Sequence, residues 1–259
     1  MHFGIERAAR TLLEARRTGT LLDAMPPDAM PRTVDEGYAI QQAVTEQWPD
    51  RVAGWKIGAT SKEIQALFGI SEPIYGPVFA KTVFDSPVRV AAGDFPHRLI
   101  ETEFAFRFAR DLPARSTAYT RDEIIEAIDA LLPSFEIVNP RFASVPAKNI
   151  PLFVADFCAN GGAVLGEPIA NWRTLDLTLA GASLAIDGVE RQRGTGALSL
   201  GDPIKALEWF VDAFSKRGQT LRTGQFVMTG TMTGLHAPAV GQLAKSTFDH
   251  AGAIEMVFV

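Results

Sequence analysis

The chain has 259 residues, enough for one large domain or for one domain with an appendage. Hydrophobic residues make up 47% and charged residues 21%, the composition of an ordinary globular protein. The net charge of −5 argues against a basic nucleic-acid-binding surface, and no apolar run approaches the roughly 20 residues that span a membrane. The single cysteine, Cys158, excludes an internal disulfide and fits a reducing cytoplasm; as a lone thiol it favours a core position.

Two helices are predicted near the N-terminus. Apolar residues recur at helical spacing within residues 3–18, and the charged residues between them indicate an amphipathic helix rather than a signal sequence. After a proline-rich loop, Thr33 and Glu36 form a Thr-x-x-Glu capping box that begins a second helix. We therefore expect an N-terminal helical region, residues 1–50, before a β-rich domain, residues 51–259.

The β-rich domain is predicted from short apolar runs separated by glycines. The first of these runs are Ala53–Ile57, Val78–Phe84, Leu99–Ala109 and Phe135–Val138. A third helix begins at a capping box, Thr120 and Glu123, and its apolar positions continue to Leu132. The second half alternates strands, one of them predicted over residues 175–186, with glycine turns around one helix at 203–214. The fold class expected from this order is α+β.

Two glutamates one residue apart, Glu101 and Glu103, lie in the strand-like run that starts at Leu99. Residues i and i+2 of a strand point the same way, so their carboxylates lie side by side while Ile100 and Phe104 face the core. Like charges so placed repel each other unless a proton or a cation lies between them. A divalent cation such as Mg²⁺ or Mn²⁺ is one solution, and a solvated polar face on an edge strand is the other.

Glu136 strengthens the prediction of a metal site. It lies between Phe135 and Ile137 in a strand that is expected to be buried, where an isolated carboxylate requires a cation or a proton. Three carboxylates on two neighbouring strands would form an oxygen-rich site, which favours Mg²⁺ or Mn²⁺ over zinc.

Lys56 is a further candidate, in the glycine-flanked run Gly54–Gly58. A lysine buried in such a strand has a lowered pKa and suits acid–base chemistry. The alternative is a lysine at a sheet edge whose ammonium group reaches solvent.

Several motifs, taken together and in this order, resemble those of the 2-keto-4-pentenoate hydratase family. That family includes 2-oxo-3-hexenedioate decarboxylases and belongs to the fumarylacetoacetate hydrolase superfamily. The matching motifs are Gly54–Ser61 (Gly-Trp-Lys-Ile-Gly-Ala-Thr-Ser), Gly69–Gly76, Ile100–Phe106, Phe135–Arg141, Gly201–Pro203 with Trp209, and Gly224–Thr233.

The resemblance implies a mixed, strongly curved β-sheet core with an N-terminal helical appendage. It implies Mg²⁺ or Mn²⁺ on Glu101, Glu103 and Glu136, and a 2-keto or enol acid that chelates the metal. The metal would act as a Lewis acid that stabilises the enolate, and ketonisation would make the distal double bond electrophilic for water. Lys56 would position the substrate acid group or shuttle a proton.

The chain departs from the family pattern at the distal end of the expected substrate. Ile74 replaces the acidic residue expected just before the aromatic Tyr75, and Ala155–Asn160 reads Ala-Asp-Phe-Cys-Ala-Asn where Ala-Asp-Asn-Ala-Ser-Ser is expected. Asp156 matches the family pattern, where it serves either as a hydrogen-bonding partner of a metal ligand or as a cap at the end of a strand. The resemblance assigns catalytic roles to Lys56 and Asp156, and substrate contacts to Lys56, Ile74, Tyr75, Asn160 and Thr229.

The leading hypothesis is a metal-dependent hydratase that converts a 2-hydroxypenta-2,4-dienoate-like acid to a 4-hydroxy-2-oxo acid. One alternative is a decarboxylase of a 2-oxo-3-hexenedioate-like acid, because the same enolate stabilisation serves loss of carbon dioxide. Another is a non-catalytic keto-acid-binding protein, given the changed polar groups. The expected partner is a small-molecule acid, with no nucleic acid and no membrane. Exposed β edges, apolar content and the resemblance indicate a homo-oligomer in the cytoplasm.

Overall fold

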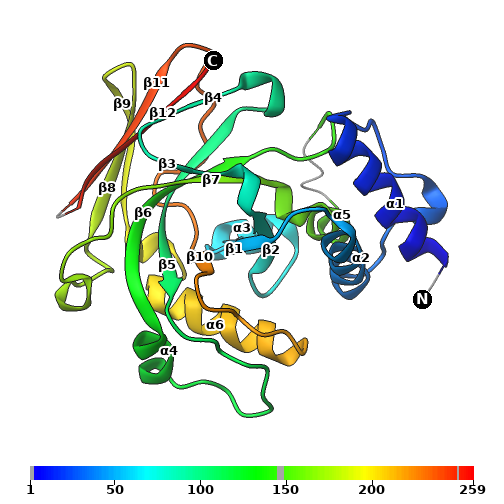
Figure 1. Cartoon of the computed structure of the whole chain (residues 1–259), viewed down its shortest axis with the longest axis horizontal. Coiled ribbons are helices and arrows are strands. Elements are labelled where there is room, and N and C mark those ends of the chain that lie inside the picture. Colours follow the sequence, from blue (N-terminus) through cyan, green and yellow to red (C-terminus); the bar gives the residue numbers. More distant parts are fainter. Residues whose placement is uncertain (1–2, 145–148, 250) are drawn as a thin grey trace.

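The computed structural model describes residues 3–144, 149–249 and 251–259 (Figure 1). Its helices are α1 (Phe3–Thr18), α2 (Val34–Gln47), α3 (Lys62–Phe68), α4 (Arg121–Ala127), α5 (Ile150–Ala155) and α6 (Pro203–Lys216). Its strands are β1 (Val52–Gly58), β2 (Ile74–Phe79), β3 (Val83–Asp85), β4 (Val88–Val90), β5 (Leu99–Phe108), β6 (Ile128–Val138), β7 (Asn160–Leu165), β8 (Gly181–Ile186), β9 (Val189–Thr195), β10 (Phe226–Met228), β11 (Leu243–Phe248) and β12 (Gly252–Phe258). None of the helices in the described ranges is long and apolar enough to cross a membrane.

The strands form two mixed sheets. The larger has the order β2-β1-β10-β5-β6-β7-β3, and the smaller has the order β4-β12-β11-β8-β9. In the larger sheet β1 pairs with β10 in parallel and with β2 antiparallel, while β5 lies between β10 and β6. Strands β1 and β5 therefore lie inside the sheet, where both neighbours satisfy their backbone groups.

The larger sheet is strongly curved. Strand β2, at one edge, contacts β7, next to the opposite edge, and Figure 1 shows β6 as a long bent arrow. The sheet therefore has an inner face, which it encloses, and an outer face. The outer face packs on the smaller sheet, where Phe104 lies 5.6 Å from Phe248 between ring centroids and the hydroxyls of Thr102 and Ser246 are 2.5 Å apart.

Helix α6 covers the outer face of β1 and β2 with aromatic side chains. Trp55 of β1 lies 4.6 Å from Phe214 between ring centroids, and Tyr75 of β2 lies 5.3 Å from Phe210. Tyr38 of α2 joins this cluster, 4.6 Å from Tyr75. Such contacts bury large apolar areas, so this face of the two strands belongs to the core.

Helices α1 and α2 lie together at one side of the molecule, with α5 against α2 (Figure 1). Their buried apolar side chains, among them Leu12, Ile40 and Leu152, form a second cluster. Helix α1 covers the predicted span 3–18, and the Thr33 hydroxyl accepts the Glu36 amide as the capping pattern predicts. Burial of an amphipathic face supplies most of the stability of such helices.

The predicted secondary structure differs from the observed elements in several places, one of them the run Val78–Phe84, which is divided between β2 and β3. The third predicted helix ends at Ala127, because the residues from Ile128 pair with β5 instead. The strand predicted over residues 175–186 begins only at Gly181. Helix α5 was not predicted; it is six residues long and is capped by the Asn149 side chain. For the third predicted helix, the pairing of residues from Ile128 onward with β5 overrides their helical periodicity.

Candidate active site

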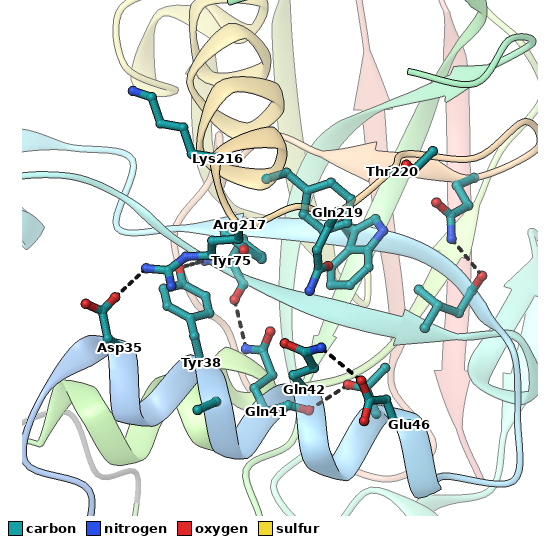
Figure 2. Close-up of a pocket in the computed structure, with 16 residues that line it drawn as sticks. Asp35, Tyr38, Gln41, Gln42, Glu46, Tyr75, Lys216, Arg217, Gln219 and Thr220 are labelled. Carbon is teal, nitrogen blue, oxygen red and sulfur yellow. Dashed lines mark hydrogen bonds and ion pairs between the residues drawn. The ribbon is translucent and has the colours of Figure 1, made fainter. Parts of the chain in front are cut away.

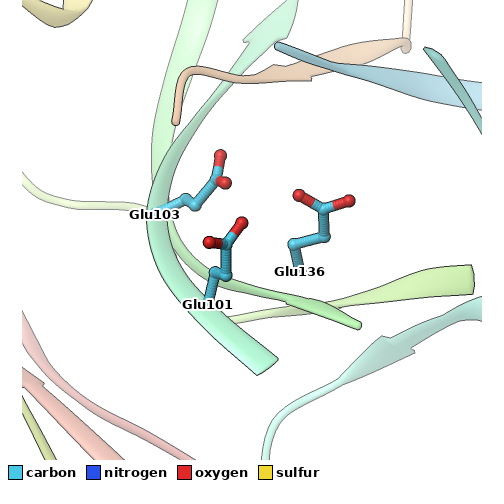
Figure 3. Close-up of side chains that lie close together, drawn as sticks. All are labelled: Glu101, Glu103 and Glu136. Atoms are coloured by element: carbon cyan, nitrogen blue, oxygen red, sulfur yellow. The ribbon is translucent and has the colours of Figure 1, made fainter. Parts of the chain in front are cut away.

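The three candidate glutamates come together on the inner face of the larger sheet. Glu101 lies directly opposite Glu136 in the β5–β6 register, and Glu103 follows two residues along β5 on the same face. One carboxylate oxygen of each residue lies within 4.8 Å of the others, and Figure 3 shows the side chains pointing toward one another. Glu103 and Glu136 are fully buried, so the alternative of a solvated edge strand does not apply.

Each fully buried carboxylate has one bonded oxygen and one free oxygen. Glu103 Oε2 accepts the Gly230 amide at 2.7 Å, and Glu136 Oε1 accepts the Asn160 side-chain amide at 3.0 Å. Within the described part of the chain, Glu103 Oε1 and Glu136 Oε2 have no hydrogen-bond partner. Buried acceptors without partners are costly, and an all-oxygen set suits a hard divalent cation. The residues present therefore fit Mg²⁺ or Mn²⁺.

The pKa values of the glutamates in the cluster also favour a bound cation. Burial, together with the charge of Glu136, raises the pKa of Glu101 to about 7 and the pKa of Glu103 well above its ordinary value. Without a cation Glu101 and Glu103 therefore hold a proton more strongly than an exposed glutamate does, and a bound divalent cation would displace it.

Lys56 lies beside this cluster. Its ammonium nitrogen is 3.2 Å from Glu136 Oε1, and its side chain is 5% exposed. Because β1 has neighbours on both sides, the alternative of a lysine at a sheet edge does not apply. Burial alone would lower the pKa of Lys56, but the carboxylates, Glu136 above all, raise it above its ordinary value. In the metal-free cluster the pKa of Lys56 is therefore raised, not lowered as expected.

Ile74 lies on the same inner face as Lys56. In the β1–β2 register Ile74 pairs with Gly58, and Lys56 pairs with Gly76. A Cβ atom added to Gly58 would lie 3.4 Å from the Lys56 nitrogen and 3.5 Å from Ile74 Cγ1, so both side chains border one small space. Ile74, which stands where the family pattern has an acidic residue, therefore places a buried hydrocarbon surface close to Lys56.

A left-handed turn at Phe157–Ala159 leads to Asn160, the partner of Glu136. The φ angles of its three residues are 59°, 51° and 63°, a conformation that costs an L residue about 1–2 kcal/mol. The Cys158 thiol donates to the Tyr75 carbonyl at 3.0 Å, and a Cβ atom at Gly76 would lie 2.2 Å from the Phe157 carbonyl oxygen. The turn was not predicted, because it lacks the glycine or asparagine that usually indicates this conformation.

The side-chain contacts of the remaining predicted site residues are with groups other than the three carboxylates. The Tyr75 side chain belongs to the aromatic cluster on the outer face, and the Thr229 hydroxyl donates to the Phe104 carbonyl at 3.3 Å. Asp156 accepts hydrogen bonds from Arg16 and from the Arg141 amide. The assigned roles of these residues stay predictions.

A pocket of about 600 Å³ also lies on the outer face, between α2 and the end of α6 (Figure 2). Tyr38, Trp55 and Tyr75 are among its lining residues, whereas none of the three glutamates is. It is therefore separate from the carboxylate cluster.

One contact of the site, the amide of Gly230 on Glu103, was not predicted from the sequence. A Cβ atom at position 230 would lie 2.2 Å from the Thr60 hydroxyl, and the φ angle of 111° also favours glycine. The motif Gly224–Thr233 contained the only signal, and it did not specify a backbone contact.

Comparison with known proteins gives a consistent result. The model of the fumarylacetoacetate (FAA) hydrolase C-terminal family matches residues 62–255. A 2-keto-4-pentenoate hydratase of Paraburkholderia xenovorans is 30% identical over 98% of this chain and 94% of its own length. A second, from Dechloromonas aromatica, is 31% identical over 86% of each chain.

Among solved structures, 4-oxalocrotonate decarboxylase of Pseudomonas putida, complexed with magnesium and adipate, superposes with a TM-score of 0.89 at 22% identity. The match covers 100% of this chain and 98% of that one, which confirms the predicted curved-sheet fold. The named hydratases confirm the predicted resemblance and the expectation of a lyase. The chain therefore belongs to the fumarylacetoacetate hydrolase family and is an enzyme.

Proposed function

We propose that this enzyme is a divalent-metal-dependent hydratase of a 2-hydroxypenta-2,4-dienoate-like acid. The observation that carries the proposal is the pair of buried oxygens on Glu103 and Glu136 that have no partner among the described residues, with Glu101 and Lys56 beside them. The 2-keto-4-pentenoate hydratases at 30% identity over nearly the whole chain support this reaction class.

The metal would be held by Glu101, Glu103 and Glu136. When bound, Mg²⁺ or Mn²⁺ supplies a Lewis acid that stabilises negative charge on the 2-oxygen of the keto acid. The Gly230 amide and the Asn160 side chain hold the Glu103 and Glu136 carboxylates in orientation. The complex of the decarboxylase relative with magnesium is consistent with this choice of ion.

Lys56 supplies a fixed positive charge for the acid group of the substrate. Its attraction for a carboxylate is stronger in this buried position than in water, because the effective dielectric constant is lower. The ammonium group can carry a proton as the dienol becomes a ketone: the enol oxygen loses its proton, C5 gains one, and the remaining 3,4 double bond is conjugated with the ketone. Water then adds across that bond, with its hydroxyl on C4 and its proton on C3, and the product is a 4-hydroxy-2-oxo acid.

Ile74 supports hydration over decarboxylation. Its buried side chain presents hydrocarbon to the space beside Lys56. Such a surface suits the hydrocarbon end of a pentadienoate, whereas the second carboxylate of a hexenedioate would lose its hydration against Ile74 while Lys56 is engaged by the first carboxylate.

The test is incubation of the enzyme with Mg²⁺ and 2-hydroxypenta-2,4-dienoate, with the loss of dienol ultraviolet absorbance followed over time. Chromatography of the product separates true hydration from ketonisation alone. We expect the 4-hydroxy-2-oxo acid to form, and chelation of the metal to stop its formation. Decay no faster than in buffer would contradict the proposal, and carbon dioxide release from 2-oxohex-3-enedioate would replace it with decarboxylation.

A further inference from the structure

A second cluster of buried charge lies at the other end of the left-handed turn. Arg16, from α1, donates through one nitrogen to the Asp156 carboxylate at 2.5 Å and to the Asp156 carbonyl at 3.1 Å. Its guanidinium carbon also lies 4.0 Å from the centroid of the Phe157 ring. The two charged side chains are 10% and 1% exposed. Arg16 thus contacts the Asp156 side chain, the Asp156 backbone and the ring of the next residue, Phe157.

The contacts continue from Asp156 through the turn to the carboxylates. The second Asp156 oxygen accepts the Arg141 amide at 2.6 Å, and the Ala159 amide donates to the Asp156 carbonyl at 2.9 Å. The next residue, Asn160, donates to Glu136 at 3.0 Å. Arg16 therefore anchors Asp156, and Asn160, whose side chain orients a metal-binding carboxylate, lies four positions further along the chain.

A contribution to stability alone does not account for this ion pair. Burial lowers the pKa of Arg16 and raises the pKa of Asp156, so the site disfavours the charged form of each partner. Buried ion pairs are often no more stabilising than apolar residues of similar size. The turn beside it is itself unfavourable, and such backbone persists only where its surroundings hold it.

We propose that Arg16 is a positioning residue: it fixes the Asp156–Asn160 segment so that the Asn160 amide orients Glu136. The inference rests on the proposed function only in taking Glu136 as a metal ligand. Arg16 lies on a helix outside the residues matched by the family model, 62–255, so α1 contributes to the site without touching it.

The test is a double-mutant cycle on Mn²⁺ affinity, measured by titration calorimetry of wild type, Arg16→Gln, Asn160→Ala and the double variant. Loss of a residue that orients a metal ligand typically lowers metal affinity about 10- to 100-fold. We expect a loss of this size in both single variants, and no further loss in the double variant, because Arg16 acts through Asn160. A merely structural role for Arg16 would not produce this coupling.

The matched control is Arg17→Gln, the same change one residue along α1. Arg17 pairs with Glu14 at the surface, with side chains 73% and 57% exposed, so we expect unchanged Mn²⁺ affinity. Additive losses in the cycle, or unchanged Mn²⁺ affinity in folded Arg16→Gln, would overturn the proposal. Should Arg16→Gln not fold, Arg16→Lys replaces it in the cycle under the same criterion, since lysine keeps the charge but loses the planar fork and ring stacking.

Turnover is measured separately from Mn²⁺ binding. An enzyme that shows the expected coupling but hydrates no dienoate would support the positioning role of Arg16 and contradict the proposed reaction. Wild type that binds no Mn²⁺ would overturn both.

Discussion

The two faces of strands β1 and β2 differ in chemistry although they alternate residue by residue. On the inner face, Lys56 and Ile74 border the carboxylate cluster. On the outer face, Trp55 and Tyr75 pack against aromatic side chains of α6. A shift of one residue in register would exchange the two faces, so the pairing of these strands decides which residues reach the site.

The two faces also differ in which kinds of buried polar atom lack a hydrogen-bond partner among the described residues. The outer face buries the Trp55 indole nitrogen and the Tyr75 hydroxyl, both neutral and both without a partner in the described residues. The inner face buries carboxylate oxygens, which cost far more without a counter-charge. Unsatisfied charge therefore indicates the functional face, and substitutions on the two faces should change different quantities.

The largest effect is expected for Glu103→Gln. A metal Lewis acid contributes several kcal/mol to the transition state, so its loss should lower kcat/KM on the order of a thousandfold. Glutamine is neutral without taking up a proton, so the cost of a buried carboxyl group is removed and the melting temperature of the metal-free variant should rise. Calorimetry with Mn²⁺ and thermal unfolding check both points, and wild-type Mn²⁺ affinity in this variant would remove Glu103 from the metal site.

Lys56→Met should separate turnover from metal binding. We expect kcat/KM to fall about 10²- to 10⁴-fold, the range for loss of a proton-transferring group. Mn²⁺ affinity should hold or increase, because the variant removes a positive charge 3.2 Å from Glu136. Steady-state kinetics beside calorimetry tests this split; a parallel loss of metal binding would argue that Lys56 serves only to organise the carboxylates.

Phe214→Ala should affect the outer face alone. Phe214 is buried and stacks 5.0 Å from Phe210 between ring centroids, so truncation should lower the free energy of unfolding by about 3–5 kcal/mol. Urea denaturation measures this change. Mn²⁺ affinity of the folded variant should equal that of wild type, and a tenfold change would show that the two faces are coupled.

The raised pKa of Glu101 predicts a pH dependence with a definite sign. The folded metal-free enzyme binds more protons than the unfolded chain between the ordinary value of 4.5 and about 7, so its stability should fall as pH rises through that window. Mn²⁺ binding displaces protons from Glu101 and Glu103, so affinity should fall by at least about tenfold per pH unit below pH 7. Melting temperatures with and without Mn²⁺ from pH 4.5 to 8 test both trends; a flat Mn²⁺ response would contradict them.

The smallest effect is expected for Tyr75→Phe. Removing a buried hydroxyl that has no partner in the described residues should leave stability unchanged or raise it by about 1 kcal/mol. If Tyr75 stays on the outer face during turnover, kcat/KM should change less than about twofold. A fall of tenfold or more would return Tyr75 to the substrate site, where the resemblance assigned it.

The sequence predicted those parts of the site that follow from local periodicity. Glu101 and Glu103 share a face because a strand repeats every two residues, and Glu136 was recognisable as a carboxylate in an apolar strand. The left-handed turn was not predictable, because Phe157, Cys158 and Ala159 give no local signal for positive φ. The Arg16–Asp156 contact joins residues 140 positions apart, which no periodicity encodes.

The central claim is that Glu101, Glu103 and Glu136 together bind one divalent cation. A crystal of the enzyme grown with Mn²⁺ tests it most directly, through the anomalous scattering of the metal. We expect one anomalous peak on the inner face, about 2.1 Å from an oxygen of each of the three glutamates. A fully occupied peak elsewhere, or a peak that contacts none of these carboxylates, would contradict the account.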